Sequence, residues 1–379
     1  MNQTEQALLD AIKKALFGAE VQFPADTDWS AVLQEARNQA VAGIAAQGAP
    51  EGIRLQWRNE SAAVIATYVR VLHTQKELVD LFAQNKIPIA ILKGTAAAVY
   101  YPNPSIRSFG DIDCIVPQDR FEISRHILRN NAYSEEENRK GSRHISYHKN
   151  GVTIELHHHF SYEGLGMEEF IQDGFDHLER KTIDGVEVPM LPKLANGMVL
   201  LMHMCQHLKS GLGLRQLIDW MMYVQAVLDD TYWEEEFEQA ADRIGLVALA
   251  KTATKTCQTY LGLHDSIGWC RDAEDELCDG LLESLMTSGN FGRKQGLDAK
   301  AEAVATDINR IGFFQKLQKS GELNWKAYKR YPRLKPFCWL YQSFRYTKQL
   351  VQSRKDIHLV KDKARADKRT ELLRKLNIS

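Results

Sequence analysis

The spacing of apolar residues divides the chain into a helical beginning, a strand-rich middle and a helical remainder. In residues 1–86, apolar side chains recur every three or four positions, which is the period of an amphipathic helix. This period predicts helices at about 4–17, 30–46 and 53–84. Between 87 and 190, the apolar runs are short and separated by turn residues, a pattern typical of strands. The helical period returns after Pro192, so we expect an α+β protein with a mixed sheet and flanking helices.

The same pattern predicts four regions along the chain. They are an N-terminal helical cap (1–86), a core that contains the strands (87–191), a helical domain (192–320) and a C-terminal helical segment (321–379). In the last region, aromatic residues alternate with lysine and arginine at 328–346. A helical hairpin with a basic rim accounts for this pattern. Binding of single-stranded nucleic acid or of a membrane surface is the alternative.

The first part of the core combines a glycine turn with two acidic residues. Residues 87–92 predict a short buried strand, and Lys93-Gly94-Thr95 breaks the apolar run before a short helix. A second strand is predicted at 111–116. Successive side chains of a strand point to opposite faces, so Asp111 and Asp113 share one face. Carboxylates held together on one face favour a hard divalent cation, although solvated residues on an edge strand give the same pattern.

The glycine turn is itself a candidate phosphate site. A strand followed by a glycine turn and a helix start exposes backbone N–H groups at a positive helix end. Gly94 permits close approach of the backbone, Thr95 adds a hydroxyl group and Lys93 adds a positive charge. Taken alone, these three residues are a weak motif.

Two hairpins are predicted later in the core. Asn150-Gly151 and Asp184-Gly185 are turn dipeptides between short apolar runs. On the strand after the first turn, Glu155 and His157 share the face opposite to the apolar residues. His158 points to the other face, so three adjacent histidines do not converge on a zinc ion. We expect His157 to contact a phosphate or an acceptor, or to pair with Glu155.

Two polar pairs follow on the predicted helices. His203 and His207 are one helical turn apart, as are Arg215 and Asp219. The simplest interpretations are two partly buried histidines and an ion pair within one helix.

The order of these motifs resembles the nucleotidyltransferase superfamily with the DNA polymerase beta-like fold. A strand is followed by Lys93-Gly94-Thr95, a helix, Tyr101-Pro-x-Pro, Arg107 and then Asp111-x-Asp113 on a strand. The chain resembles most closely an uncharacterised nucleotidyltransferase family of bacteria. The resemblance is close over 87–116 and looser to about Phe291. The superfamily usually has Gly-Gly or Gly-Ser where this chain has Gly-Thr.

This resemblance implies a nucleotidyltransferase fold and a Mg²⁺- or Mn²⁺-dependent enzyme. Such an enzyme moves a nucleoside monophosphate from an NTP to an acceptor and releases pyrophosphate. The implied metal ligands are Asp111 and Asp113, with Glu155 as a third ligand or as the base. The implied nucleotide-binding residues are Lys93, Gly94, Thr95, Arg107 and His157. The helical residues that the resemblance places near the pocket are His203, His207, Arg215 and Asp219.

The composition indicates the cellular compartment but does not identify the acceptor. The net charge is −1, so no overall basic surface indicates nucleic acid, and a small molecule, a protein or RNA all fit as acceptor. The six cysteines are scattered without a C-x-x-C motif, which predicts a reducing cytoplasm. No apolar run approaches the ~20 residues of a membrane helix. Oligomeric state is not predicted.

Two other functions are compatible with the sequence. The first is a nucleotide-binding scaffold, or an inactive relative of the enzymes. The intact pair Asp111 and Asp113 argues against this function. The second, which fits less well, is a metal-dependent hydrolase that uses the histidines.

Overall fold

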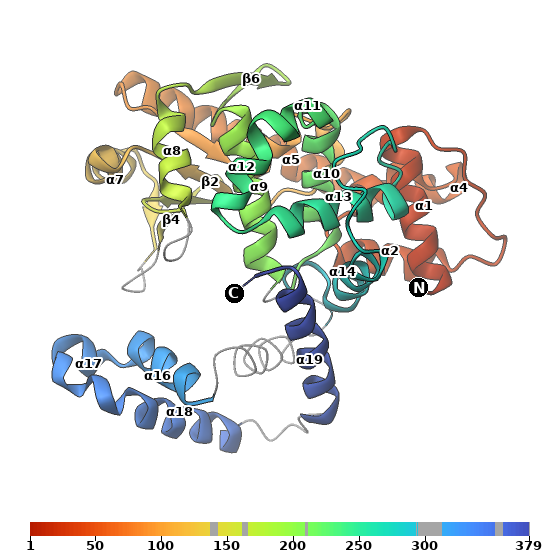
Figure 1. Ribbon diagram of the computed structural model, residues 1–379. Helices are drawn as coiled ribbons and strands as arrows, with labels where there is room; N and C mark the ends of the chain where they lie inside the picture. The colour runs from red at the N-terminus through yellow and green to blue at the C-terminus, as the bar shows by residue number, and fades with distance from the viewer. Residues whose placement is uncertain are drawn as a thin grey trace.

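The architecture is a mixed β-sheet surrounded by helices (Figure 1). The computed structural model describes residues 1–136, 143–160, 166–208, 211–292, 294, 313–352 and 359–378. Within these residues, seven strands form one sheet and helices make up most of the remainder. The predicted α+β class, with flanking helices, a helical beginning and a mainly helical C-terminal part, is confirmed.

The sheet is mixed because its central strands run in both directions. The strands are β1 Ala90–Leu92, β2 Ile112–Ile115, β3 Ser134–Glu135, β4 His144–Lys149, β5 Val152–His157, β6 Glu179–Ile183 and β7 Val186–Met190. Their order is β3-β4-β5-β2-β1-β7-β6. β2 is antiparallel to β1 but parallel to β5. Both predicted hairpins are confirmed, as β4–β5 and β6–β7, whereas the sequence pattern does not predict β3.

The pairing register brings the acidic residues together. Leu92 lies opposite Asp113 in the β1–β2 pair, and Asp113 lies beside Glu155 in the β2–β5 pair. Paired residues of adjacent strands project from the same face of a sheet. The carboxylates of Asp113 and Glu155 therefore meet on one face, and Lys93 follows directly after β1.

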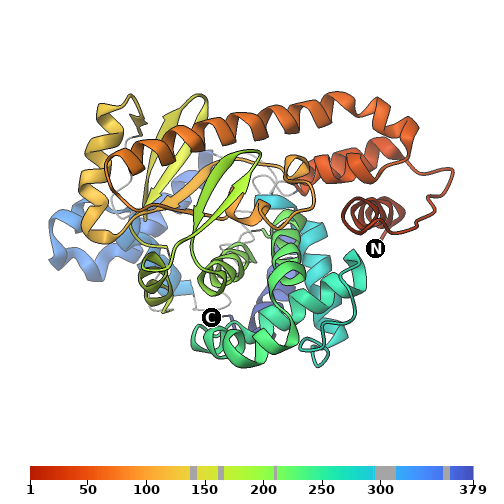
Figure 2. The same ribbon diagram turned by 90° about the horizontal axis from the view of Figure 1, so that it is seen from above.

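The opposite face of the central strands is buried against two helices, α5 (Arg58–Gln84) and α7 (Phe121–Asn130). Ile91, Cys114 and Leu156 contribute to this hydrophobic cluster and are at most 1% exposed. Figure 2 shows α5 as a long helix that extends from the N-terminal helices across the sheet. The other face carries Asp113 and Glu155 together with the buried Ala90, Leu92 and Ile115, which belong to the second hydrophobic cluster.

The N-terminal helices are α1 Gln3–Phe17, α2 Trp29–Asn38, α3 Ala42–Gly48 and α4 Glu51–Gln56, followed by α5. The prediction of one helix at 30–46 is wrong, because the chain breaks between α2 and α3. Ala40 there has a left-handed φ of +56°. The buried amide of Gln39 donates a hydrogen bond to the carbonyl of Leu285 and accepts one from the N–H of Leu214. These bonds tie the end of α2 to distant helices. The predicted helix at 53–84 is likewise divided, at Trp57.

The other helical segments lie beside and after the sheet. They are α6 Gly94–Ala98, η1 Pro104–Ile106, η2 Gln118–Arg120, α8 Met167–Phe175, α9 Lys193–Leu208, α10 Leu214–Val227, α11 Asp230–Tyr232, η3 Trp233–Phe237, α12 Glu238–Arg243, α13 Val247–Leu261, α14 Asp275–Ser288, η4 Asn290–Gly292, α16 Phe313–Asn324, α17 Lys326–Arg330, η5 Pro332–Phe337, α18 Cys338–Gln352 and α19 Leu359–Lys375. The aromatic and basic stretch at 328–346 is helical, as the favoured interpretation predicts. None of the described helices has the length and apolar character needed to cross a membrane.

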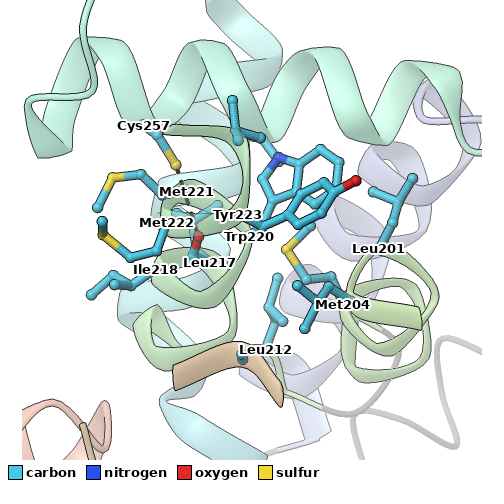
Figure 3. Close-up of a cluster of buried hydrophobic side chains, with 14 of the residues drawn as sticks. Leu201, Met204, Leu212, Leu217, Ile218, Trp220, Met221, Met222, Tyr223 and Cys257 are labelled. Atoms are coloured by element: carbon cyan, nitrogen blue, oxygen red, sulfur yellow. Dashed lines mark hydrogen bonds between the residues drawn. The ribbon is translucent and has the colours of Figure 1, made fainter. Parts of the chain in front are cut away.

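Helices α9 and α10 are the parts of the helical core that approach the face of the sheet that carries the acidic residues. The side chains of α10, among them the fully buried Trp220, lie between Cys257 of α13 and Met204 of α9 (Figure 3). Gly197 of α9 lies against Tyr223 of α10, where a Cβ atom would come within 2.4 Å of the phenol oxygen. The glycine therefore allows the close packing that places the two helices side by side.

Candidate active site

A cavity of about 390 Å³ lies where β1, β2, β4 and β5 meet α9 and α10. It brings together ten of the predicted site residues, namely Lys93, Gly94, Arg107, Asp111, Asp113, Glu155, His157, His203, His207 and Arg215. Thr95 and Asp219 do not line it. A larger surface groove of about 870 Å³ lies between α14 and α19 and contains none of these residues. The predicted site residues are therefore gathered in the smaller cavity.

Three carboxylates converge at the end of the cavity where the β-sheet forms the wall. Asp111, Asp113 and Glu155 each offer one oxygen, and these oxygens lie within 4.8 Å of one another. Asp111 is exposed, yet the protein atoms packed around it and the nearby charge of Asp113 raise the pKa of its carboxyl group. Such repulsion is relieved by a cation, and carboxylate oxygens are the ligands that Mg²⁺ and Mn²⁺ prefer. The three residues therefore fit a divalent cation.

Lys93 reaches these carboxylates from a strained turn. It follows β1 with a φ of +53°, which is unfavourable for a residue with a side chain, and Gly94 continues the turn at +42°. The Lys93 Nζ atom lies 2.8 Å from Asp113 Oδ1. Burial alone raises the pKa of Asp113, but the charge of Lys93 and a hydrogen bond from His157 outweigh it and hold that pKa well below its usual range. Asp113 is thus ionised and already held by both Lys93 and His157.

His157 lies between the buried Asp113 and the partly exposed Glu155. Its Nε2 atom is 3.0 Å from Asp113 Oδ1 and 3.6 Å from Glu155 Oε2. Burial disfavours the charged imidazole, but these two carboxylates outweigh burial and raise the pKa of His157. The predicted pairing of His157 with Glu155 is present, and Asp113 is a closer partner.

Arg107 lines the cavity, but its guanidinium group is already engaged. It donates two hydrogen bonds of 2.7 Å to Asp219 and one of 3.2 Å to the carbonyl of Ser108. Asp219 also accepts a hydrogen bond of 2.7 Å from Tyr101. The ion pair of Asp219 is therefore with Arg107, and the interpretation that Asp219 pairs with Arg215 within α10 is wrong.

Thr95 is buried beneath the turn, with 1% of its surface exposed. Its hydroxyl group donates a hydrogen bond of 2.5 Å to Gln75 Oε1 on α5. The side chain thus joins the turn to α5 instead of facing the cavity.

Comparison with known families agrees with the chemistry of this cavity. Residues 25–262, well over half of the chain, match a family described as "Uncharacterised nucleotidyltransferase". The chain belongs to this nucleotidyltransferase family. Among solved structures it is similar to an antigenic nucleotidyltransferase-like protein from Paracoccidioides brasiliensis. The identity is 14% and the TM-score 0.33, and the match covers 54% of this chain and 96% of that one. None of the curated proteins matches the chain.

In this member of the nucleotidyltransferase family, the wall opposite the carboxylates comes from α9, α10 and η4. Burial, with the charge of Lys93, lowers the pKa of His203 far below its usual value and that of His207 to about 3. Both imidazoles are therefore neutral at physiological pH. Arg215 lies over the ring of Phe291, with 5.4 Å from Cζ to the ring centroid. Its pKa is lowered, first by burial and then by Arg107.

Six residues that line this cavity were not among the predicted site residues: Gly110, Arg143, His144, Phe160, Gln206 and Phe291. His144 pairs with His157 across the β4–β5 hairpin, and the Asn150-Gly151 turn was sufficient to predict that register. Gln206 lies one residue before His207 on α9, and no local pattern distinguishes it. Phe291 has a left-handed φ of +56° and is 49% exposed, so its place depends on the fold around η4.

Proposed function

We propose that the protein is a metal-dependent nucleotidyltransferase of the DNA polymerase beta-like superfamily. It moves a nucleoside monophosphate from an NTP to an acceptor and releases pyrophosphate. The observation that carries this proposal is the convergence of Asp111, Asp113 and Glu155 within 4.8 Å in a cavity that also contains Lys93. Membership of the nucleotidyltransferase family supports the same chemistry.

The three carboxylates hold Mg²⁺, or Mn²⁺ in its place. When bound, the cation neutralises charge on the phosphates and positions the reacting oxygens. Asp111 and Asp113 are ligands in this proposal. Glu155 either completes the metal site or accepts the proton of the attacking acceptor group. The variant Glu155→Gln separates these roles, because loss of a base abolishes transfer but leaves metal-dependent NTP binding intact.

Positive charge for the phosphates comes from the turn after β1. The Lys93 ammonium group lies 2.8 Å from Asp113, so it would also reach phosphates bound to a cation that Asp113 holds. Gly94 lines the cavity, so its backbone is accessible to a phosphate oxygen. Arg107 binds Asp219 and so holds α10 in place, without contacting the phosphates itself. Thr95 fixes the turn through its hydrogen bond to Gln75. His157 orients Asp113.

The remaining wall of the cavity contacts the rest of the nucleotide or the acceptor. His203 and His207 offer neutral imidazoles there, and Phe291 offers a half-exposed ring. Among the described residues, Nδ1 of His207 and Nε of Arg215 are buried without a hydrogen-bond partner.

The experiment that tests the function uses each α-labelled NTP with Mg²⁺ or Mn²⁺. The wild-type protein is compared with the double variant Asp111→Ala/Asp113→Ala, with RNA, protein and small molecules offered as acceptors. Label transferred by the wild type alone supports the proposal and identifies the acceptor class. Mg²⁺-dependent NTP binding without transfer to any acceptor favours a nucleotide-binding scaffold. Absence of both binding and transfer overturns the proposal.

A further inference from the structure

A second group of potential metal ligands lies beside the three carboxylates. His144 on β4, together with Glu155 and His157 on β5, offers two imidazole nitrogens and one carboxylate oxygen. These three atoms lie within 4.8 Å of one another. His144 Nδ1 is 3.3 Å from Glu155 Oε2, and His157 Nε2 is 3.6 Å from the same oxygen. One carboxylate oxygen therefore faces a nitrogen from each of two strands.

These separations match the edges of a small coordination tetrahedron. Zinc binds nitrogen and oxygen ligands at about 2.0–2.1 Å, so two ligands of a tetrahedral site are roughly 3.3 Å apart. The two nitrogen–oxygen separations, 3.3 and 3.6 Å, are close to that value. No large movement of either strand is needed for the three atoms to share one ion.

The orientation of His157 fits the same role. Its Nε2 atom faces the carboxylates, while Nδ1 lies 3.4 Å from the backbone carbonyl oxygen of His159. A histidine that binds a metal through one ring nitrogen generally donates its other N–H to a carbonyl or a carboxylate. This contact fixes the ring with Nε2 facing the carboxylates, and a bound metal ion would take the place of the proton that Nε2 shares with Asp113 Oδ1.

The hairpin explains how the sequence builds this group. The tight turn at Asn150-Gly151 sets a register in which His144 lies opposite His157. Because side chains alternate along a strand, Glu155 falls on the same face as His157. The run of three histidines thus contributes one candidate ligand, and the neighbouring strand supplies the second.

We propose that His144, Glu155 and His157 bind a nitrogen-preferring divalent cation, with Zn²⁺ as the best geometric fit. The two imidazoles distinguish this position from the adjacent one formed by Asp111, Asp113 and Glu155. Imidazole favours zinc and its transition-metal neighbours, whereas an all-carboxylate set suits Mg²⁺. Water, a substrate oxygen or the neighbouring Asp113 Oδ1, which is 3.0 Å from His157 Nε2, would supply the fourth ligand. Glu155 belongs to both groups, so it bridges two unlike cations.

The existence of this metal position does not depend on the proposed function, whereas its part in nucleotidyl transfer does rest on that function. Two metals that share a carboxylate are suited to in-line displacement at phosphorus, where they stabilise the attacking and the leaving oxygens. If Glu155 bridges two cations, it acts as a ligand and not as the base. A nitrogen-preferring ion at one of the two positions makes the enzyme require a transition metal in addition to Mg²⁺.

The test uses Co²⁺ as a spectroscopic probe of the full-length protein after removal of bound metal with a chelator. We expect visible absorption bands typical of four-coordinate Co²⁺ that saturate at one ion per chain. Zn²⁺ removes these bands by displacement and excess Mg²⁺ does not. The variant His144→Ala should lower Co²⁺ affinity by about 100-fold or more, because even loss of an outer-shell partner costs roughly 10–100-fold.

Two further variants make the result specific. His144→Gln keeps a polar partner for Glu155 but removes the imidazole, so it should fold normally by circular dichroism and still lose the Co²⁺ bands. His148→Ala is the matched control, because His148 is on the same strand and the same face as His144 but outside the cavity. It should retain the bands. Asp111→Asn should also retain them, since Asp111 belongs only to the carboxylate group.

The outcomes separate this inference from the proposed function. Co²⁺ bands that persist in folded His144→Gln overturn the histidine site, and so does their absence from the wild type, even where Mg²⁺-dependent transfer is observed. Bands that require His144, in a protein that neither binds nor transfers an NTP, support the metal site and overturn the nucleotidyltransferase proposal.

Discussion

Arg107 and Asp219 form a buried ion pair that joins the loop before β2 to α10. Two hydrogen bonds of 2.7 Å link the guanidinium to the two carboxylate oxygens, and each side chain is 4% exposed. Burial lowers the pKa of Arg107, but Asp219 outweighs it, so the guanidinium stays charged. The pair holds Arg215 against the cavity, because Arg215 lies one turn before Asp219 on α10.

Removing one partner of this pair should destabilise the protein strongly. In Arg107→Met, the buried carboxylate of Asp219 loses both charge-assisted hydrogen bonds. Breaking a buried pair in this way costs about 3–5 kcal/mol. We expect a decrease of that size in the free energy of unfolding, measured by urea denaturation.

Two comparisons test the cause of this decrease. Arg107→Met/Asp219→Leu should lose less than the single variant, because no unpaired charge is left buried. Arg180→Ala removes an exposed partner of Glu187 and should cost less than about 1 kcal/mol. A loss in Arg107→Met no greater than in Arg180→Ala would contradict the structural role given to the buried pair.

Asp111→Asn should stabilise the metal-free protein while abolishing its response to Mg²⁺. The pKa of Asp111 is raised by the surrounding protein atoms and by Asp113, so its ionised form is less favourable in the folded than in the unfolded state. A neutral amide removes that cost at neutral pH. Melting temperatures with and without Mg²⁺ measure both effects. A variant less stable than wild type without metal would show that the repulsion is not significant.

Lys93→Ala should affect metal and nucleotide binding in opposite directions. Without the ammonium group, Asp113 is no longer neutralised, so affinity for Mg²⁺ alone should rise. Affinity for an NTP should fall by about tenfold or more, since a hydrogen bond from a charged group contributes about 1.5–3 kcal/mol. Isothermal titration calorimetry measures both constants.

Lys86→Ala is the control for this variant. Lys86 is an exposed lysine just before β1, and its φ of +55° is close to that of Lys93. We expect no change in either affinity. If Lys93→Ala weakens both, Lys93 supports the shape of the turn and does not compete with the metal.

His207→Gln should make the protein less sensitive to acid. Burial, aided by Lys93 and Arg215, lowers the pKa of His207 from 6.5 to about 3. Below pH 6.5, the unfolded chain therefore binds a proton that the folded chain does not, and stability falls as the pH decreases toward 3. This loss is about 1.4 kcal/mol per pH unit at most. Urea unfolding between pH 6.5 and about 5 should show a shallower decline in the variant. Parallel declines in both proteins would mean that His207 titrates normally.

Local patterns predicted the part of the site that lies on the strands. The alternation at Asp111 and Asp113, and the turn at Asn150-Gly151, are properties of adjacent residues, and backbone geometry converts them directly into shared faces. Helix boundaries were predicted less well. The break between α2 and α3 depends on Gln39, whose amide bonds to backbone groups more than 170 residues away.

Charge pairing shows the same limit. The spacing of Arg215 and Asp219 suits an ion pair within one helix, but Asp219 pairs with Arg107 instead. Helix geometry brings residues four apart close together, yet a distant guanidinium that is buried at the right place offers two hydrogen bonds in fixed geometry. The spacing of Arg215 and Asp219 in the sequence does not indicate that Arg107 is close enough to pair with Asp219.

The sequence by itself determined the fold class, the two hairpins and the face of the sheet on which the acidic residues and His157 lie. These features follow from side-chain alternation and turn chemistry, which act over a few residues. Only the tertiary structure decided that β2 lies parallel to β5, which places Asp113 beside Glu155, and that α9 and α10 close the cavity. Both arrangements depend on burying the apolar faces of elements that are far apart in the chain. The free energy of that burial comes from the packing of the whole core, so no local stretch of sequence determines it.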